Sequence, residues 1–363
     1  MELMQASRQW ATRPADERYT SLVDMLAHFR AQRVSSREVI VPSRRITVDA
    51  VADGSHKGLV ITGPNGHAYA PTNWSFGQLA QLADAPAGYL RKLPAELAAD
   101  CINIGLHALR DVEDVGCLLY RNGGEPVLRA ATGPRYGRIW NADIVQGLVD
   151  RFGDGATGTW RVPGEFGKLM PVTTANTTLF ASDRDMFVFL ADETNRIEIP
   201  NRRAGKMGTF ARGFFVWNSE VGSATFGLAT FLFDYTCCNR IVWGARDFKQ
   251  ITLRHTASAP LRFIDEITPA LRSYAAASDA SVVHAIEDAR KHVIKDKVED
   301  FLANRKFSRS TIAAAMTAHK LEEGRPIETV WDAVTGLTAV ARSIEHQDVR
   351  VDLERAAGKL MAA

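Results

Sequence analysis

Between residues 158 and 255 the chain carries seven strand-like segments in succession, without a helical segment between them. The segments are short and rich in β-branched and aromatic residues, as in GFFVWNS (213–219) and ATFGLATFLFDYT (224–236). Neighbouring parallel strands need long crossover connections, which are usually helical. We therefore expect an α+β protein with a largely antiparallel sheet and packed helices, and not a doubly wound parallel sheet.

Helical patterns lie on both sides of this strand-rich part. Residues 16–33 place Leu22, Met25, Leu26 and Phe29 at the spacing of one helix face, and helical periodicity continues from Pro260 to the end. The 363 residues exceed the usual size of one domain. We expect three parts, which are an N-terminal helical arm (1–45), an α+β core domain (46–259) and an α-helical C-terminal region (260–363).

The composition indicates the cellular compartment in which we expect the protein to act. No window approaches the roughly 18 apolar residues that cross a bilayer, and the first residues lack an apolar signal segment. The four cysteines form neither a disulfide framework nor a metal-binding spacing. We expect a cytoplasmic protein with reduced cysteines and no membrane partner.

A search for catalytic motifs finds none that is specific. There is no nucleophile elbow, no phosphate-binding loop with its lysine, and no histidine spacing typical of a metal site. We expect no catalytic residue, no metal and no cofactor. One alternative stays open, because oxygen ligands from Asp183, Asp185, Glu193 or Glu220 would suit Mg²⁺ in a metal-dependent nuclease. Acidic pairs such as Asp183 and Asp185 are more often turn or salt-bridge residues.

Positive charge is concentrated in the strand-rich half. Residues 200–255 hold eight basic and three acidic residues, although the whole chain has a net charge of only +2. The glycine-rich loop 201–213, NRRAGKMGTFARG, contains Arg202, Arg203, Lys206 and Arg212. A flexible basic loop can follow phosphates without reading sequence. The alternative is a solvated loop that binds nothing.

A second basic cluster lies in LRAATGPRYGRIW (128–140). Here Arg129, Arg135 and Arg138 alternate with Tyr136 and Trp140. Single-stranded nucleic acid is bound by this combination, because bases stack on aromatic rings while cations hold the backbone. Alternatively, the two aromatic residues belong to the core and the arginines are ordinary surface residues.

The strand FFVW (214–217) runs directly into the polar residues Asn218, Ser219 and Glu220 before Gly222. Polar side chains at a buried strand end need hydrogen-bond partners. We expect them to brace the following turn and the neighbouring strand around residues 237–239, or else to bind a ligand.

Four stretches together resemble a known family. They are SFGQLAQLADAPAGYLRKLP (75–94), LRAATGPRYGRIWNADIV (128–145), GFFVWNSEVGSATFGLATFLFDYTCCNRIVWG (213–244) and VWDAVTGLTAVARSIEHQDVRVDLERAAGKLM (330–361). Their order resembles the phage- and plasmid-borne family called domain of unknown function 932. The chain departs from that pattern at 132–134 and 237–240, where it has Thr-Gly-Pro and Cys-Cys-Asn-Arg. In outline, an antiparallel sheet with helices and a basic groove is also similar to the Rad52-like single-strand annealing proteins.

The leading hypothesis is a non-catalytic protein that binds and anneals single-stranded DNA during phage or plasmid recombination. Its C-terminal helices would assemble copies of the chain into a ring or filament. A structural or partner-binding module without nucleic acid is the other alternative. The residues expected to contact nucleic acid are Arg129, Arg135, Tyr136, Arg138, Arg202, Arg203, Lys206, Arg212 and Arg254.

Overall fold

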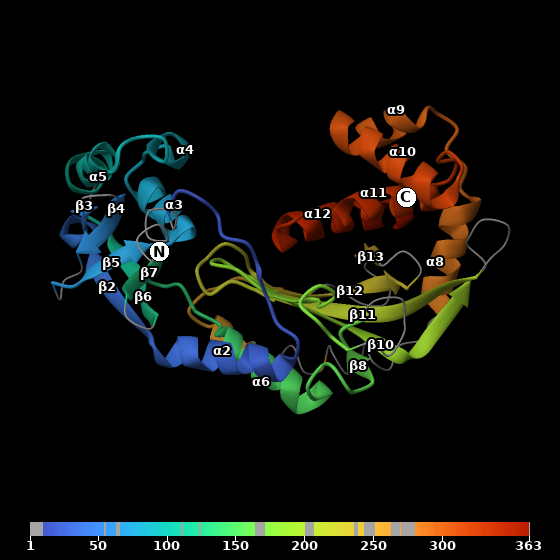
Figure 1. The fold of residues 1–363 in the computed structure, drawn as a ribbon, viewed down its shortest axis with the longest axis horizontal. Coiled ribbons are helices and arrows are strands. Elements are labelled where there is room, and N and C mark those ends of the chain that lie inside the picture. Colours follow the sequence, from blue (N-terminus) through green and yellow to red (C-terminus); the bar gives the residue numbers. More distant parts are fainter. Residues whose placement is uncertain are drawn as a thin grey trace.

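The computed structural model describes residues 10–53, 56–62, 66–109, 112–122, 125–163, 171–199, 207–235, 239–242, 251–262, 269 and 280–362. These residues form two separate β-sheets, each with its own helices, followed by a helical C-terminal region (Figure 1). The predicted α+β class and the helical C-terminal region are thus confirmed. We expected one sheet, whereas the strands divide between two.

The small sheet has six strands in the order β2-β6-β7-β5-β4-β3, and only the β5–β7 pair is parallel. The bounds are β2 Ser36–Pro42, β3 Thr47–Asp53, β4 His56–Thr62, β5 Ala68–Pro71, β6 Asp114–Asn122 and β7 Glu125–Thr132. Helices α3 (Asn73–Leu82), α4 (Ala87–Leu90) and α5 (Ala95–Ile104) lie beside it in Figure 1. Short 3₁₀ and π-helical turns occupy Ser43–Arg45 and Gly105–Leu109.

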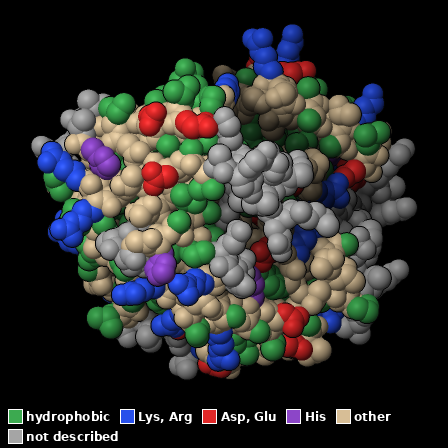
Figure 2. Space-filling view, turned by 60° about the vertical axis from the view of Figure 1, so that its left-hand side comes forward, with side chains coloured by type: hydrophobic (Ala, Val, Ile, Leu, Met, Phe, Trp, Pro, Cys, Tyr) green, Lys and Arg blue, Asp and Glu red, His purple; other side chains and the backbone are tan. Residues whose placement is uncertain are grey.

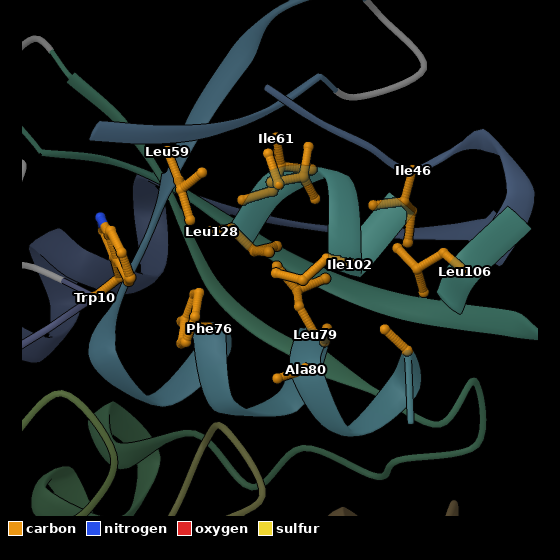
Figure 3. Close-up of a cluster of buried hydrophobic side chains, with 14 of the residues drawn as sticks. Trp10, Ile46, Leu59, Ile61, Phe76, Leu79, Ala80, Ile102, Leu106 and Leu128 are labelled. Carbon is orange, nitrogen blue, oxygen red and sulfur yellow. The ribbon is translucent and has the colours of Figure 1, made fainter. Parts of the chain in front are cut away.

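Apolar side chains from these strands and helices meet in one core (Figure 3). Phe76 and Leu79 of α3 and Ile102 of α5 point toward Leu59 of β4, and each is at most 2% exposed. Trp10 enters the same core from the N-terminal segment and packs against Phe76 with ring centroids 4.8 Å apart. The N-terminal segment is therefore part of the small-sheet core.

The large sheet has eight antiparallel strands, most of them in the order β1-β9-β10-β11-β12-β13. β8 and β14 pair with β10 and β12 respectively. The bounds are β1 Glu17–Arg18, β8 Trp160–Arg161, β9 Leu179–Ala181, β10 Met186–Ile199, β11 Gly208–Asn218, β12 Phe226–Asp234, β13 Asn239–Ile241 and β14 Ile251–Leu253. A bulge between Ala191 and Arg196 shifts the β10–β11 register.

One face of the large sheet, which we call the aliphatic face, packs against two helices. These are α2 (Leu22–Val34) and α6 (Asn141–Phe152), which lie together on one side of the sheet in Figure 1. All four apolar residues predicted for the α2 stripe are buried in this core. The sheet contributes Leu179, Ala181, Met186, Val188, Leu190, Phe214, Val216, Phe226, Leu228 and Leu253.

The opposite face carries rings at alternate positions of the same strands, because successive side chains of a strand point to opposite sides. We call it the aromatic face. Its rings are Phe180, Phe187, Phe189, Phe215, Trp217, Phe231, Phe233 and Tyr235. Two glycines lie directly across the ladder from rings, with Gly213 opposite Phe231 and Gly227 opposite Trp217. A Cβ on Gly227 would lie 1.9 Å from the Trp217 ring, so the missing side chain makes room for the indole.

The C-terminal helices are α8 (Ala280–Lys291), α9 (Val298–Ala303), α10 (Arg309–Glu323), α11 (Val330–Ala341) and α12 (Gln347–Gly358), followed by a 3₁₀ turn at Lys359–Ala362. They form a third core with residues at the far end of the large sheet, including Phe210, Leu232 and Ile241. From this group α12 extends back toward the small sheet (Figure 1). No helix among the described residues is long and apolar enough to cross a membrane.

Candidate nucleic-acid interface

The polar triplet at the end of β11 is hydrogen-bonded inside the protein, although Asn218 Oδ1 has no partner among the described residues. Asn218 donates through Nδ2 to the carbonyl of Ile139 and to Asn141 Oδ1, while the Ser219 hydroxyl donates to the carbonyl of Arg184 at 2.6 Å. Glu220, only 3% exposed, accepts the backbone N–H of Asn141 at 2.8 Å through Oε1. The triplet therefore braces the start of α6 and the β9–β10 turn. Bracing of the following turn was predicted, and Ser219 Oγ provides it by accepting the backbone N–H groups of Val221 and Ser223. The strand around 237–239 was also predicted as a partner, but residues 237 and 238 lie outside the described residues.

Three of the predicted phosphate contacts are buried. Arg129 is 7% exposed and pairs with Glu220 Oε2 at 2.8 Å. Arg138 pairs with Glu38 and lies against the rings of Tyr136 and Trp140. Arg212 in β11 is also buried. Carboxylates already neutralise Arg129 and Arg138, so the described residues do not form the continuous basic groove that the sequence suggested.

Two of the predicted cations are exposed. Arg135 and Arg254 both reach solvent, and neither has an ion-pair partner among the residues that the structure describes. Arg202, Arg203 and Lys206 lie outside the described residues. The face shown in Figure 2 carries its lysines and arginines in several separate groups with acidic residues between them. On this face, a polyanion could therefore contact only separate, local groups of basic residues.

Arg135 lines a pocket on the surface of the protein. This pocket of about 730 Å³ lies between two turns that are far apart in the sequence, Gly133–Tyr136 and His255–Ser258. Gly137 fixes the two turns together, because its N–H donates to the His255 carbonyl and its own carbonyl lies 3.0 Å from His255 Nδ1. A Cβ at Gly137 would lie 1.8 Å from the Thr256 carbonyl oxygen, so only glycine allows this approach.

Tyr136 and His255 stack at the pocket, with ring centroids 4.8 Å apart and planes 17° from parallel. The Tyr136 hydroxyl donates to the Ser219 carbonyl at 2.7 Å, which ties the pocket to the β11 end. Burial raises the pKa of Tyr136, and burial lowers the pKa of His255. Both rings are therefore uncharged near neutral pH, and His255 Nε2 has no hydrogen-bond partner among the described residues.

The carboxylates considered for Mg²⁺ are dispersed. Glu220 is bound as described, and Glu193 accepts from Arg161, Arg196 and Tyr235. Asp183 accepts the Trp74 N–H, and Asp185 accepts the Ser182 hydroxyl. No three acidic, histidine or cysteine side chains among the described residues are grouped so as to hold a metal ion.

The aromatic face was not among the features predicted from the sequence. Four arginines lie over its rings: Arg18 over Phe180 at 5.8 Å, Arg240 over Phe189 at 3.9 Å, Arg196 over Tyr235 at 4.8 Å, and Arg355 over Trp217 at 4.2 Å. The alternation of rings at 187 and 189, 215 and 217, and 231, 233 and 235 was visible in the sequence. It indicates that one strand face is made of rings.

No family model, curated protein or solved structure matches this chain. The resemblance to domain of unknown function 932 therefore stays a prediction from the sequence.

Proposed function

We propose that this protein binds single-stranded nucleic acid, with DNA favoured, and does so without catalysis. The observation that carries the proposal is the pocket between Gly133–Tyr136 and His255–Ser258, where an exposed arginine adjoins two stacked, uncharged rings. Three residues expected from the sequence, Arg135, Tyr136 and Arg254, belong to these two turns or directly precede one of them.

The pocket suits a nucleotide in size and charge. Small-molecule sites commonly measure about 300–1,000 Å³, and this one holds about 730 Å³. Its lining includes Arg135 and no carboxylate among the described residues. A base would pack beside the Tyr136–His255 pair, while Arg135 contacts a phosphate and Arg254 supplies a second positive charge nearby.

We extend the proposal to annealing and recombination on mobile elements. Annealing requires several protein copies along one strand, and the C-terminal helices offer a surface for self-assembly into a ring or filament. Leu321 of α10 is 80% exposed and is an apolar position available for such a contact.

Binding of a fluorescent (dT)30 oligonucleotide at several salt concentrations tests the proposal. We expect tight binding at low salt that weakens steeply as salt rises. Replacing Arg135 and Arg254 by alanine should weaken binding and reduce the slope of log K against log [salt] by about 1.4, since each single-strand phosphate contact contributes about 0.7. Arg309→Ala is the matched control, because it removes an exposed arginine at the start of α10.

Two further variants sharpen the result. Replacing Arg202, Arg203 and Lys206 together by alanine tests whether the 201–213 loop also contacts phosphate, which would lower the slope further. The proposal is wrong if the wild-type protein shows no binding at low salt, or if Arg309→Ala changes the slope as much as the Arg135 and Arg254 changes do.

A further inference from the structure

Helix α12 covers the aromatic face with a polar surface. Its buried positions include Gln347, Val351 and Glu354, and only Val351 joins the apolar cluster of that face. Contact is made mainly by charged groups, since Arg240 of β13 donates to Glu354 Oε1 at 3.0 Å and to Gln347 Oε1 at 2.8 Å. Arg355 of α12 lies over Trp217 and Phe215. An amphipathic helix normally presents an apolar stripe to such a surface.

The polar groups under α12 are incompletely paired. Arg240 Nη1, Glu354 Oε2, and Arg355 Nε and Nη2 are buried without a hydrogen-bond partner among the described residues. Burial lowers the pKa of Arg240 to about 9, which reflects how strongly this site disfavours a charge. Buried polar groups in proteins are nearly always hydrogen-bonded, so α12 covers the sheet at a substantial cost.

The beginning of α12 is held by the N-terminal segment. Arg13 donates to both carboxylate oxygens of Asp348, at 3.0 and 2.7 Å. Asp16 accepts the backbone N–H of Gln347 at 2.7 Å. These contacts lie outside the ring surface, so they can be removed without altering the rings.

We propose that the aromatic face is a second surface for the bases of single-stranded nucleic acid, and that α12 is a displaceable cover over it. This inference rests on the proposed function and adds a second binding surface to it. Bases stack on aromatic side chains irrespective of sequence, and arginines placed among the rings supply the positive charge that a phosphate chain requires. A strand that displaced α12 would exchange its incompletely paired charges for stacking and phosphate contacts.

Hydrogen–deuterium exchange on the full chain, with and without saturating (dT)30, tests the cover directly. We expect the amides of α12 to exchange at least about fivefold faster when the oligonucleotide is bound, because the bound state holds α12 open. Helix α2 is the control, since it packs on the aliphatic face and should not change. Unchanged or slower exchange in α12 at saturation overturns the inference and leaves the pocket proposal standing.

A pair of variants tests the same inference through affinity. Arg13→Ala loosens the cover and should raise the affinity for (dT)30 by up to about tenfold, because the binding-competent fraction increases. Removal of a positive charge by itself would lower the affinity, so the direction of the change in affinity distinguishes the two effects. Arg309→Ala is the control for the loss of charge. The gain should disappear when Trp217→Leu is added.

The outcomes separate the two proposals. One outcome would be that the wild-type protein does not bind (dT)30, whereas the Arg13→Ala variant binds it and loses this binding when Trp217→Leu is added. In that case α12 is a displaceable cover over the aromatic face, and the pocket is not the primary binding site. If Arg13→Ala leaves affinity unchanged or lowers it, the cover is refuted. Circular dichroism on each variant verifies that the chain is folded, and the exchange experiment on the wild-type protein needs no variant.

Discussion

The two faces of the large sheet are built from alternate residues of the same strands, yet they are covered in different ways. On the aliphatic face, α2 and α6 supply an apolar stripe to Leu, Val, Met and Phe side chains. On the aromatic face, α12 supplies Gln347, Glu354 and Arg355 to a surface of rings. The first arrangement maximises apolar burial, which is the main source of stability. The second leaves buried polar atoms of Arg240, Glu354 and Arg355 without a hydrogen-bond partner among the described residues, and this contrast is the basis of our proposal that the aromatic face binds nucleic acid.

The largest expected loss of stability comes from removing a buried ring from the aliphatic face. Phe214 is 1% exposed and packs against Phe152 and Trp160, with ring centroids 5.0 and 5.3 Å away. Phe214→Ala should lower the free energy of unfolding by about 3–5 kcal/mol, because it removes buried apolar surface and leaves a cavity. Urea denaturation measures this change. The affinity of the folded protein for (dT)30 should not change.

Phe215 is the matched residue on the aromatic face. Phe215→Ala should also reduce stability, but it should in addition weaken (dT)30 binding by the folded protein, since one ring is worth about 1–3 kcal/mol of stacking. Equal effects of the two substitutions on affinity would show that the faces do not differ in function.

The same contrast between structural and binding groups applies to the arginines. Glu220→Gln leaves the Arg129 charge buried without its partner and should lower the free energy of unfolding by about 3 kcal/mol. Glu287→Gln is the control, because Glu287 pairs with Lys291 and both side chains are exposed, at 46% and 75%, so its removal should cost less than about 1 kcal/mol. Thermal or urea denaturation compares the two. If they cost the same, Arg129 is not a buried structural group.

A smaller effect is expected where the cover begins. Burial raises the pKa of Asp185 to about 7, and Asp348 and Asp16 add to this while Ser182 and Arg13 oppose it. The folded protein therefore holds a proton that the unfolded chain releases near pH 4. The contribution of Asp185 to the free energy of unfolding is fully present below about pH 4 and is lost as the pH rises to about 7. Roughly 2 kcal/mol of it is lost between pH 4.5 and 6.5.

Asp185→Asn removes this titration. We expect the variant to lose less stability than the wild type across that pH range when unfolding is followed by urea titration. Parallel pH profiles of the two proteins would mean that Asp185 does not titrate there.

Local patterns predicted the elements well. The α2 stripe and the C-terminal helices follow from helical spacing, and the antiparallel strands follow from the lack of crossovers. The division into two sheets does not, because pairing joins distant segments, as when β2 pairs with β6. Arg129 and Arg138 seemed exposed because their partners, Glu220 and Glu38, are 91 and 100 residues away in the sequence.

The site was partly predictable for the same reason. Tyr136 and Arg135 stood out as an aromatic residue beside a cation, but nothing near them indicated that His255 would complete the stack. The aromatic face was readable from ring alternation, whereas its cover by α12 depends on contacts such as Arg13 with Asp348 that span 335 residues.

Photocrosslinking of the wild-type protein to a 5-bromouracil-substituted single strand, followed by peptide mapping, tests the central claim most directly. The account predicts crosslinked peptides that contain Tyr136 or His255 at the pocket, and Phe215 or Trp217 on the aromatic face. Crosslinks confined to the α8–α10 part of the C-terminal region, under conditions where the strand is bound, would contradict it.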